Sequence, residues 1–189
     1  TAAIAHARRR GVEVVEFGGE DGSRAHVDYL IELAGACYRA GGARYAYPDT
    51  VGYFAPEGVD YYIPKIVAAF PDKPLVIHFH NDFGMAAYNT VRALHHGATI
   101  PTVTVNGIGE RAGNASLEEI VMALKTRPAL FGAATGIHAE EIMRTSRLLS
   151  GITGIDVQPN KAIVGRNAFA HESGIHQDGV LKDARTYEI

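Results

Sequence analysis

Short apolar runs alternate along the chain with longer segments in which apolar residues recur at helical spacing. The apolar runs begin near residues 12, 44, 75 and 102, and a polar loop follows each of them. Short runs that are rich in β-branched and aromatic residues predict strands. Their spacing of about 30 residues is the length of one strand–helix crossover unit. The pattern therefore predicts four parallel strands with helices between them.

The bounds of the expected elements follow from these runs and from the turn residues between them. The predicted strands are residues 12–17, 44–47, 74–80 and 102–106. The predicted helices are residues 2–10, 25–40, 59–70, 84–96, a segment that begins at Ser116, and 139–149. Pro64 predicts a late start or a kink in its helix. Ser116 and Glu119 fit a capping box, in which each side chain satisfies a backbone N–H.

Two architectures contain four such units: an open doubly wound sheet and half of a (β/α)8 barrel. No Gly-x-Gly-x-x-Gly sequence follows any predicted strand, which disfavours a dinucleotide-binding sheet. Polar residues stand at the carboxyl end of every predicted strand, where barrel enzymes place their chemistry. We therefore expect an α/β fold in which residues 1–130 form four barrel units. Residues 131–189, which are rich in glycine turns and polar loops, are expected to form a small helical and loop subdomain.

Composition narrows the class of partner. The chain is 47% hydrophobic and 21% charged with a formal net charge of −3, which is typical of a soluble globular protein and predicts no nucleic-acid partner. No apolar run is long enough to span a bilayer, so no membrane partner is expected. Cys37 is the only cysteine, which excludes an internal disulfide and predicts a cytoplasmic protein. The chain starts at Thr1 inside a helical pattern and stops abruptly, so we interpret it as an internal part of a longer protein.

The segment His78-Phe79-His80 is the sharpest chemical signal in the sequence. Alternate side chains of a strand share one face, so the two imidazoles are expected to point the same way and to be able to hold one cation. Asn81 and Asp82 follow at once and add oxygen donors. A mixed imidazole–oxygen set suits a divalent metal ion. The alternative is a pair of histidines that only hydrogen-bond to their neighbours.

Two later segments also combine polar residues with glycines. Glycines between Asn106 and Asn114 let the backbone approach a ligand closely, and Asn114 precedes a predicted helix N-terminus that favours anionic groups. The alternative there is an ordinary loop with a surface pair of Glu110 and Arg111. His171 and His176 flank carboxylate and hydroxyl side chains that suit a general base. That segment is otherwise read as a polar surface.

The first two predicted strand ends carry weaker signals. Glu16 and Glu20 suit an acid or base if they are desolvated, and are otherwise solvated loop carboxylates. Asp49 and Thr50 stand where the second predicted strand ends, and by themselves they fit an ordinary turn.

Five segments taken together resemble the family of 2-isopropylmalate, citramalate and homocitrate synthases. They are residues 16–21, 48–53, 78–84, 106–117 and 158–182. Each motif alone is modestly specific, whereas all five in this order are strongly specific, and the resemblance covers nearly all of the chain. It implies a (β/α)8 barrel of which residues 1–130 hold the later four strands, followed by part of a linker subdomain in residues 131–189.

The resemblance implies a metal centre. His78 and His80 would be metal ligands, and Asn114 would complete the site directly or through water. The cofactor would be a divalent ion: Mn, Zn, Mg or Co. The family's remaining ligand is an Asp in an Arg-Asp-Gly setting beside a catalytic Arg, and this sequence contains no such motif.

The resemblance also implies catalytic roles. Glu20 matches the family's active-site Glu, and Thr50 matches a substrate-contacting Thr. His176 matches a His that helps to deprotonate acetyl-CoA from the partner subunit of a homodimer, and His171 is the fallback for that role. We also assign substrate binding to two residues of the third segment, Asn106 and Glu110.

The implied reaction is a Claisen-type condensation of acetyl-CoA with a 2-oxo acid, with 2-oxoisovalerate preferred, as in leucine biosynthesis. The chain departs from the family at Gly18-Gly19, where Ser-Pro or similar is usual, and at Tyr88, where a small residue is usual. The region that recognises the side chain of the 2-oxo acid lies largely before residue 1 in the family. Citramalate and homocitrate synthases therefore remain alternatives. The chain alone is expected to be inactive.

Two further alternatives belong to other classes of protein. One is a metal-dependent lyase on the same barrel, of the hydroxymethylglutaryl-CoA lyase kind, and residues 167–179 favour the synthase over it. The other is a non-catalytic chain that acts as an assembly partner. Half a barrel leaves two open strand edges, so we expect self-association of the isolated chain.

Overall fold

The computed structural model describes residues 1–187, and the chain divides into two compact units, Thr1–Gly136 and Ile137–Ile189. The division falls a few residues after the boundary that the sequence predicts. No helix of the described residues is long and apolar enough to cross a membrane.

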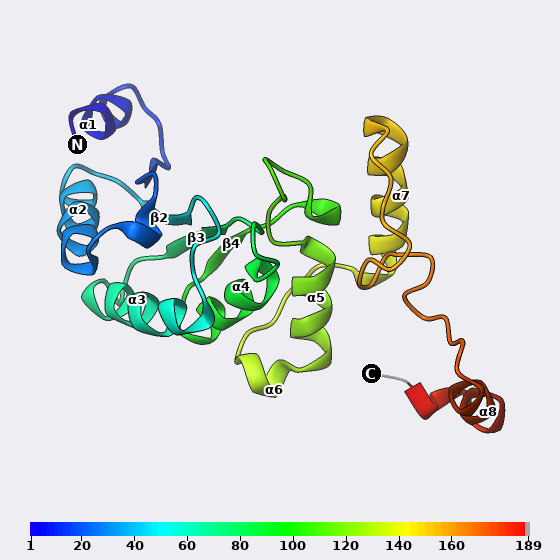
Figure 1. The fold of residues 1–189 in the computed structure, drawn as a ribbon. Helices are drawn as coiled ribbons and strands as arrows, with labels where there is room; N and C mark the ends of the chain where they lie inside the picture. The colour runs from blue at the N-terminus through cyan, green and yellow to red at the C-terminus, as the bar shows by residue number, and fades with distance from the viewer. Residues whose placement is uncertain (188–189) are drawn as a thin grey trace. The chain divides into compact units, whose positions relative to one another are not determined.

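The first unit contains a four-stranded parallel sheet whose strands are adjacent in chain order. Its strands are β1 (Glu16–Gly18), β2 (Arg44–Asp49), β3 (Leu75–Phe79) and β4 (Ile100–Thr102). Its helices are α1 (Ala2–Arg9), α2 (Val27–Arg39), α3 (Pro56–Ala69), α4 (Ala86–His95), α5 (Leu117–Thr126) and α6 (Pro128–Phe131), with short 3₁₀ turns η1 (Gly22–Arg24) and η2 (Val105–Gly107). The α2, α3 and α4 helices lie along one side of the strands (Figure 1). Right-handed crossovers between strands in chain order place the connecting helices on the same face, as in a barrel and unlike a doubly wound sheet.

The two faces of the sheet have different roles. Tyr45, Tyr47, Ile77 and Phe79 alternate along β2 and β3, and all four are almost fully buried against the helices. The alternate positions therefore point to the opposite face. The register places Pro48 beside His78, so the predicted histidine lies on the face that the helices leave uncovered.

The bounds predicted for the first and fourth strands were wrong. The first strand covers Glu16–Gly18 rather than 12–17, and Val12 and Val14 are about half exposed at 45% and 52%. The fourth covers Ile100–Thr102 rather than 102–106. Beyond it, the N–H of Thr104 donates to the carbonyl of Ala115 at 3.0 Å, so this segment pairs with the loop before α5 instead of extending β4.

One helix start and one helix cap also differ from the prediction. The α3 helix begins at Pro56, whose missing N–H suits a first helical position, and it continues through Pro64. The α5 helix has Ser116 at its N-cap as predicted, but the hydroxyl makes no capping hydrogen bond, so the capping box is not formed.

The second unit is small and contains mostly helices and loops. Its elements are η3 (Ala139–Glu141), α7 (Ile142–Thr153), α8 (Gly174–Lys182) and η4 (Ala184–Tyr187). Where one helix was predicted over 139–149, the structure has the 3₁₀ turn η3 followed by the α7 helix. Only Ile142 and Val164 are buried apolar residues among the described part of this unit.

A charged cluster joins α3 to α4 on the outer surface of the first unit. Arg92 donates from Nε to Asp60 Oδ1 at 2.6 Å and from Nη2 to Oδ2 at 3.0 Å. His96 Nε2 lies 2.7 Å from the same Oδ1. The hydrogen bond from Arg92, followed by that from His96, lowers the pKa of Asp60 to about 2.

The variant Asp60→Asn tests this cluster through the pH dependence of stability. The folded-state pKa lies below the unfolded value of about 4, so the carboxylate stabilises the fold above about pH 4 and loses this effect as the pH falls towards 2. We expect the variant to be less stable than the natural chain near neutral pH and to approach it at about pH 2. Chemical denaturation across this window measures the difference, with Asp72→Asn on the exposed turn before β3 as control. A difference that stays constant with pH would contradict the assignment.

Candidate functional site

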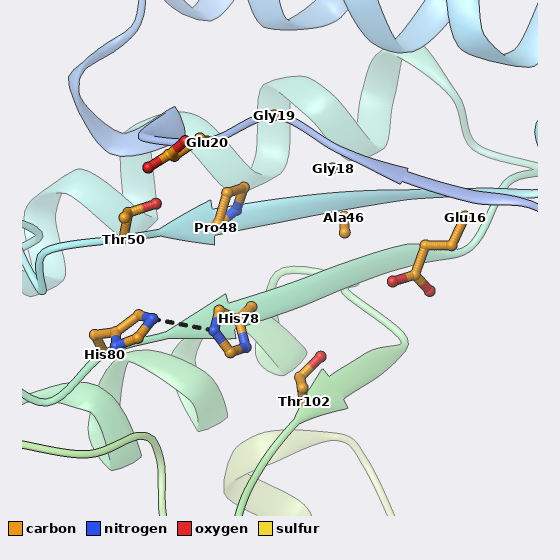
Figure 2. Close-up of a pocket in the computed structure, with 10 residues that line it drawn as sticks. All are labelled: Glu16, Gly18, Gly19, Glu20, Ala46, Pro48, Thr50, His78, His80 and Thr102. Atoms are coloured by element: carbon orange, nitrogen blue, oxygen red, sulfur yellow. Dashed lines mark hydrogen bonds between the residues drawn. The ribbon is translucent and has the colours of Figure 1, made fainter. Parts of the chain in front are cut away.

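Two histidines at the carboxyl end of β3 form the centre of the candidate site. His78 lies within the strand and His80 directly after it. Their Nε2 atoms are 3.1 Å apart, and their rings meet edge to face at 83° (Figure 2). The predicted convergence of the two imidazoles is therefore what the structure shows.

Neighbouring loops hold this pair in place. The N–H of His80 donates to the carbonyl of Asp49 at 3.3 Å, and His80 forms an isolated antiparallel bridge with Asn114. The side-chain amide nitrogen of Asn114 lies 3.4 Å from His78 Nε2. His80 is 8% exposed, and its Nδ1 is buried without a hydrogen-bond partner among the described residues. Three side chains from β3 and from the loop after β4 thus meet at one point.

The donor atoms fit a divalent cation as part of its ligand set. Two nitrogens that are each about 2.1 Å from one cation lie about 3.0 to 3.4 Å apart at angles of about 90° to 109°. The observed 3.1 Å between the Nε2 atoms falls in this range. No group of three or more His, Cys, Asp or Glu side chains suited to a metal occurs in residues 1–187. Further ligands would therefore be the Asn114 amide and oxygens supplied by solvent, substrate or residues outside this chain.

The protonation of His78 also suits a metal ligand. Burial lowers the pKa of His78, a positive charge on His80 lowers it further, and Glu110 acts in the opposite direction. A lowered pKa keeps the imidazole neutral near neutral pH, which is the form that binds a cation.

The prediction that Asn81 and Asp82 add metal donors is not supported by their contacts. Asn81 Oδ1 accepts the N–H of Ala86 at 3.1 Å, at the start of α4. The Asp82 carboxylate accepts hydrogen bonds from Arg111 Nε at 2.7 Å and Nη2 at 3.0 Å. Both side chains stabilise loops instead.

A cavity of about 360 Å³ opens beside the histidine pair. Its lining includes the predicted residues Glu20, Thr50, His78 and His80 (Figure 2). Thr50 Oγ1 accepts the N–H of Asp21 at 2.8 Å, which leaves the hydroxyl hydrogen able to donate to a ligand. The exposed Glu20 lies in the loop after β1. With Glu16 and Thr102, which also line it, the cavity combines two imidazoles, two hydroxyls and two carboxylates.

Two predicted substrate-binding residues do not line this cavity. Asn106, with φ of 62°, donates its backbone N–H to Glu118 Oε2 at 3.0 Å. The Glu110 side chain is 81% exposed. Their roles stay predictions.

The predicted bases of the second unit lie close to each other. The ring centroids of His171 and His176 are 5.7 Å apart, and Tyr187 lies 4.6 and 5.1 Å from them. Within this unit, therefore, the two candidate bases share one aromatic cluster.

The burial of two carboxylates was not predicted from the sequence. Asp49 is 1% exposed, and its oxygens accept the N–H groups of Tyr53 at 2.8 Å and Phe54 at 3.0 Å. It thereby fixes the turn that carries Thr50, and an Asp at a strand end before a Gly-containing turn was the available signal. Glu118, in the first turn of α5, is equally buried.

Comparisons with known proteins show to which protein family the chain belongs. Residues 1–149 match the HMGL-like family model, and residues 163–189 match the model described as homocitrate synthase post-HMGL domain-like. Hydroxymethylglutaryl-CoA lyase from Pseudomonas aeruginosa superposes with a TM-score of 0.70 at 18% identity, over 89% of this chain and 58% of that one. The parallel sheet with helices on one face is thus part of a TIM barrel, as predicted. The chain belongs to the HMGL-like family.

Relatives that match nearly the whole chain share one name. The 2-isopropylmalate synthase of Heliobacterium modesticaldum is 54% identical over 178 residues, which are 93% of this chain and 35% of that protein. The 2-isopropylmalate synthase of Neisseria meningitidis serogroup B is 53% identical over 184 residues, 96% of this chain and 36% of that protein. The predicted resemblance to the synthases is therefore confirmed, and the chain spans about a third of the length of these relatives.

The variant Asp49→Asn tests how the Thr50 turn is held. An amide replaces one of the two acceptor oxygens by an NH₂ group, which leaves a backbone N–H of Tyr53 or Phe54 unsatisfied. We expect a loss of about 1–3 kcal/mol in the free energy of unfolding, measured by urea denaturation. Asp72→Asn on an exposed turn is the control, and equal stability of the two variants would contradict the role.

Proposed function

We propose that this chain is part of a metal-dependent condensing enzyme that joins the acetyl group of acetyl-CoA to a 2-oxo acid. The preferred substrate is 2-oxoisovalerate, which gives 2-isopropylmalate for leucine biosynthesis. The observation that carries the proposal is the meeting of His78 and His80 in a polar cavity at the carboxyl ends of the strands. The 2-isopropylmalate synthases that match nearly the whole chain support it.

The proposed metal centre consists of His78, His80 and Asn114 with a divalent Mn, Zn, Mg or Co ion. When bound there, such an ion would polarise the keto group of the 2-oxo acid and stabilise the charge that develops on its oxygen. The Nε2 atoms of the two histidines would bind the ion, and Asn114 would complete the site directly or through water. An Asp outside this chain is proposed as the remaining ligand.

The proposed catalytic groups divide the work of orientation and proton transfer. The Thr50 hydroxyl orients the 2-oxo acid by donating a hydrogen bond, because its oxygen already accepts from Asp21. His176, with His171 as the fallback, forms with Glu20 the base set that takes a proton from the acetyl methyl group, and in the family this His comes from the partner subunit. Asn106 and Glu110 are proposed to bind the substrate. Water then cleaves the thioester and releases CoA.

The alternatives rest on weaker observations. Citramalate and homocitrate synthases use the same proposed residues, so only a substrate assay separates them from the main proposal. Likeness to the lyase structure is below 25% identity and concerns the fold alone. The match of residues 163–189 to a synthase-type model favours the synthase.

Assembly and location are also part of the proposal. In the described sheet, β1 and β4 each pair with a strand on one side only. Their open edges would let the chain alone self-associate, which is also what the alternative role as an assembly partner requires. A homodimer or higher assembly without nucleic-acid or membrane partners is proposed for the enzyme. We propose the cytoplasm as its location, in keeping with the single buried Cys37.

A metal titration tests the centre directly. We expect the chain to bind Mn²⁺ or Zn²⁺ in calorimetry, and the double variant His78→Ala/His80→Ala to lose this binding, because it removes both nitrogen ligands. His95→Ala, at the exposed end of α4, is the matched control and should bind as the natural chain does. Equal binding by the double variant would refute the site.

A substrate assay separates the proposed function from its alternatives. A longer chain that includes the upstream strands is expected to release CoA from acetyl-CoA fastest with 2-oxoisovalerate among a set of 2-oxo acids. The chain of 189 residues alone is expected to be inactive. Faster release with pyruvate or 2-oxoglutarate would point to the citramalate or homocitrate synthase reaction, and cleavage of hydroxymethylglutaryl-CoA would point to the lyase.

A further inference from the structure

The residues of the proposed site come from four different loops that follow the four strands. Glu20 follows β1, Thr50 follows β2, His80 follows β3 and Asn114 follows β4. Loops of this kind are the mobile parts of a barrel, so their relative positions must be fixed by contacts between them. The side chain of Arg111 supplies the contacts that join three of these loops.

The sequence offered a surface pair of Arg111 with Glu110, and the structure contains that pair as the longer of the two ion pairs of Arg111. The shortest approach of the two charged groups is 3.7 Å, and the Glu110 side chain is 81% exposed. The main partner is Asp82, which accepts hydrogen bonds from Arg111 Nε at 2.7 Å and Nη2 at 3.0 Å. The same Nη2 donates to the carbonyl oxygen of Thr50 at 2.6 Å.

These bonds connect all four loops in one chain of contacts. Arg111 stands in the loop after β4, three positions before Asn114, and Asp82 stands two positions after His80. Thr50 accepts from Arg111 through its backbone and from Asp21 through its hydroxyl, and Asp21 belongs to the loop after β1. The loop after β3 is also tied to the loop after β4 by the N–H of Asn81, which donates to the carbonyl of Gly113 at 2.9 Å.

The backbone at Arg111 has a conformation that glycine adopts more easily than arginine. Its φ is 55°, in the left-handed region that costs a non-glycine residue on the order of 1–2 kcal/mol. Glycine would adopt this conformation without strain but would lose the guanidinium. A planar guanidinium can hold a carboxylate at two points and a carbonyl at a third, which an ammonium cannot do in one geometry.

We infer that Arg111 is a positioning residue that locks the loops after the four strands and so sets where Thr50, His80 and Asn114 stand relative to one another. The consequence for metal binding rests on the proposed function. Removing groups that hold metal ligands in place typically lowers affinity about 10- to 100-fold, even though the ligands themselves remain. Arg111 acts through Thr50, Asp82 and the backbone and touches no reacting atom.

Arg92 offers a matched control on the same unit. It forms an ion pair with Asp60 of the same two-point geometry, at 2.6 and 3.0 Å, with similar exposure of the arginine side chain, 36% against 42% for Arg111. That pair joins α3 to α4 on the outer surface and involves none of the four loops. A general loss of stability would therefore be the same for both variants, whereas a loss of positioning would be specific to Arg111.

The test uses nitrogen-15 NMR of the histidine rings in the 189-residue chain, together with a Zn²⁺ titration. In Arg111→Gln, which keeps the backbone strain but removes the guanidinium, we expect the ring signals of His78 and His80 to move and the zinc dissociation constant to rise about tenfold or more. Arg111→Lys should show nearly the same signal changes and weaker zinc binding as Arg111→Gln. Asp82→Asn, which removes the partner carboxylate, should also show them. In Arg92→Gln the signals of His78 and His80 and the zinc affinity should stay unchanged.

Two results would overturn the inference: unchanged His78 and His80 signals in both Arg111→Gln and Asp82→Asn, or equal changes in Arg92→Gln. Failure of the proposed function has a different signature. In that case the natural chain takes up no zinc at the histidine pair, while its ring signals without metal still respond to Arg111→Gln.

Discussion

The approach of two imidazole nitrogens to 3.1 Å at the tip of β3 is the interaction on which the functional account depends. Two neutral nitrogens at this distance need a proton or a cation between them, because their lone pairs otherwise repel. The sheet produces this arrangement without any special local geometry. One strand face is filled with aromatic and aliphatic side chains that the helices bury, so the alternate side chains, His78 among them, must point to the other face.

The cavity beside the histidines follows from the same division of faces. All crossovers run on one side of the sheet, so the carboxyl ends of four strands and their loops meet on the side of the cavity. Buried Asp49 and the contacts of Thr50 then determine the shape of the loop beside it. The chemistry therefore lies in short polar loops, and the apolar sheet fixes where those loops start.

Periodicity predicted the central part of this fold well and its edges poorly. The strands β2 and β3 and the helix between them were found near their expected positions, because burial on a single face gives a clear pattern in the sequence. Val12 and Val14 imitate a strand but are half exposed. Thr104 pairs with residues around position 115, a contact that the local pattern does not contain.

For the site, alternation along one strand was enough to pair His78 with His80. The partners of Asp82 and Thr50 were missed because Arg111 is 29 and 61 positions away from them in the sequence.

The most direct measurement is a crystal structure of the chain grown with Mn²⁺ or Zn²⁺, with anomalous scattering recorded at the absorption edge of the metal. The account predicts one anomalous peak bonded to the Nε2 atoms of both His78 and His80, at about 2.0–2.3 Å from each. A peak bonded to only one ring, a peak elsewhere, or two histidines that remain hydrogen-bonded to each other in the presence of the metal would contradict it.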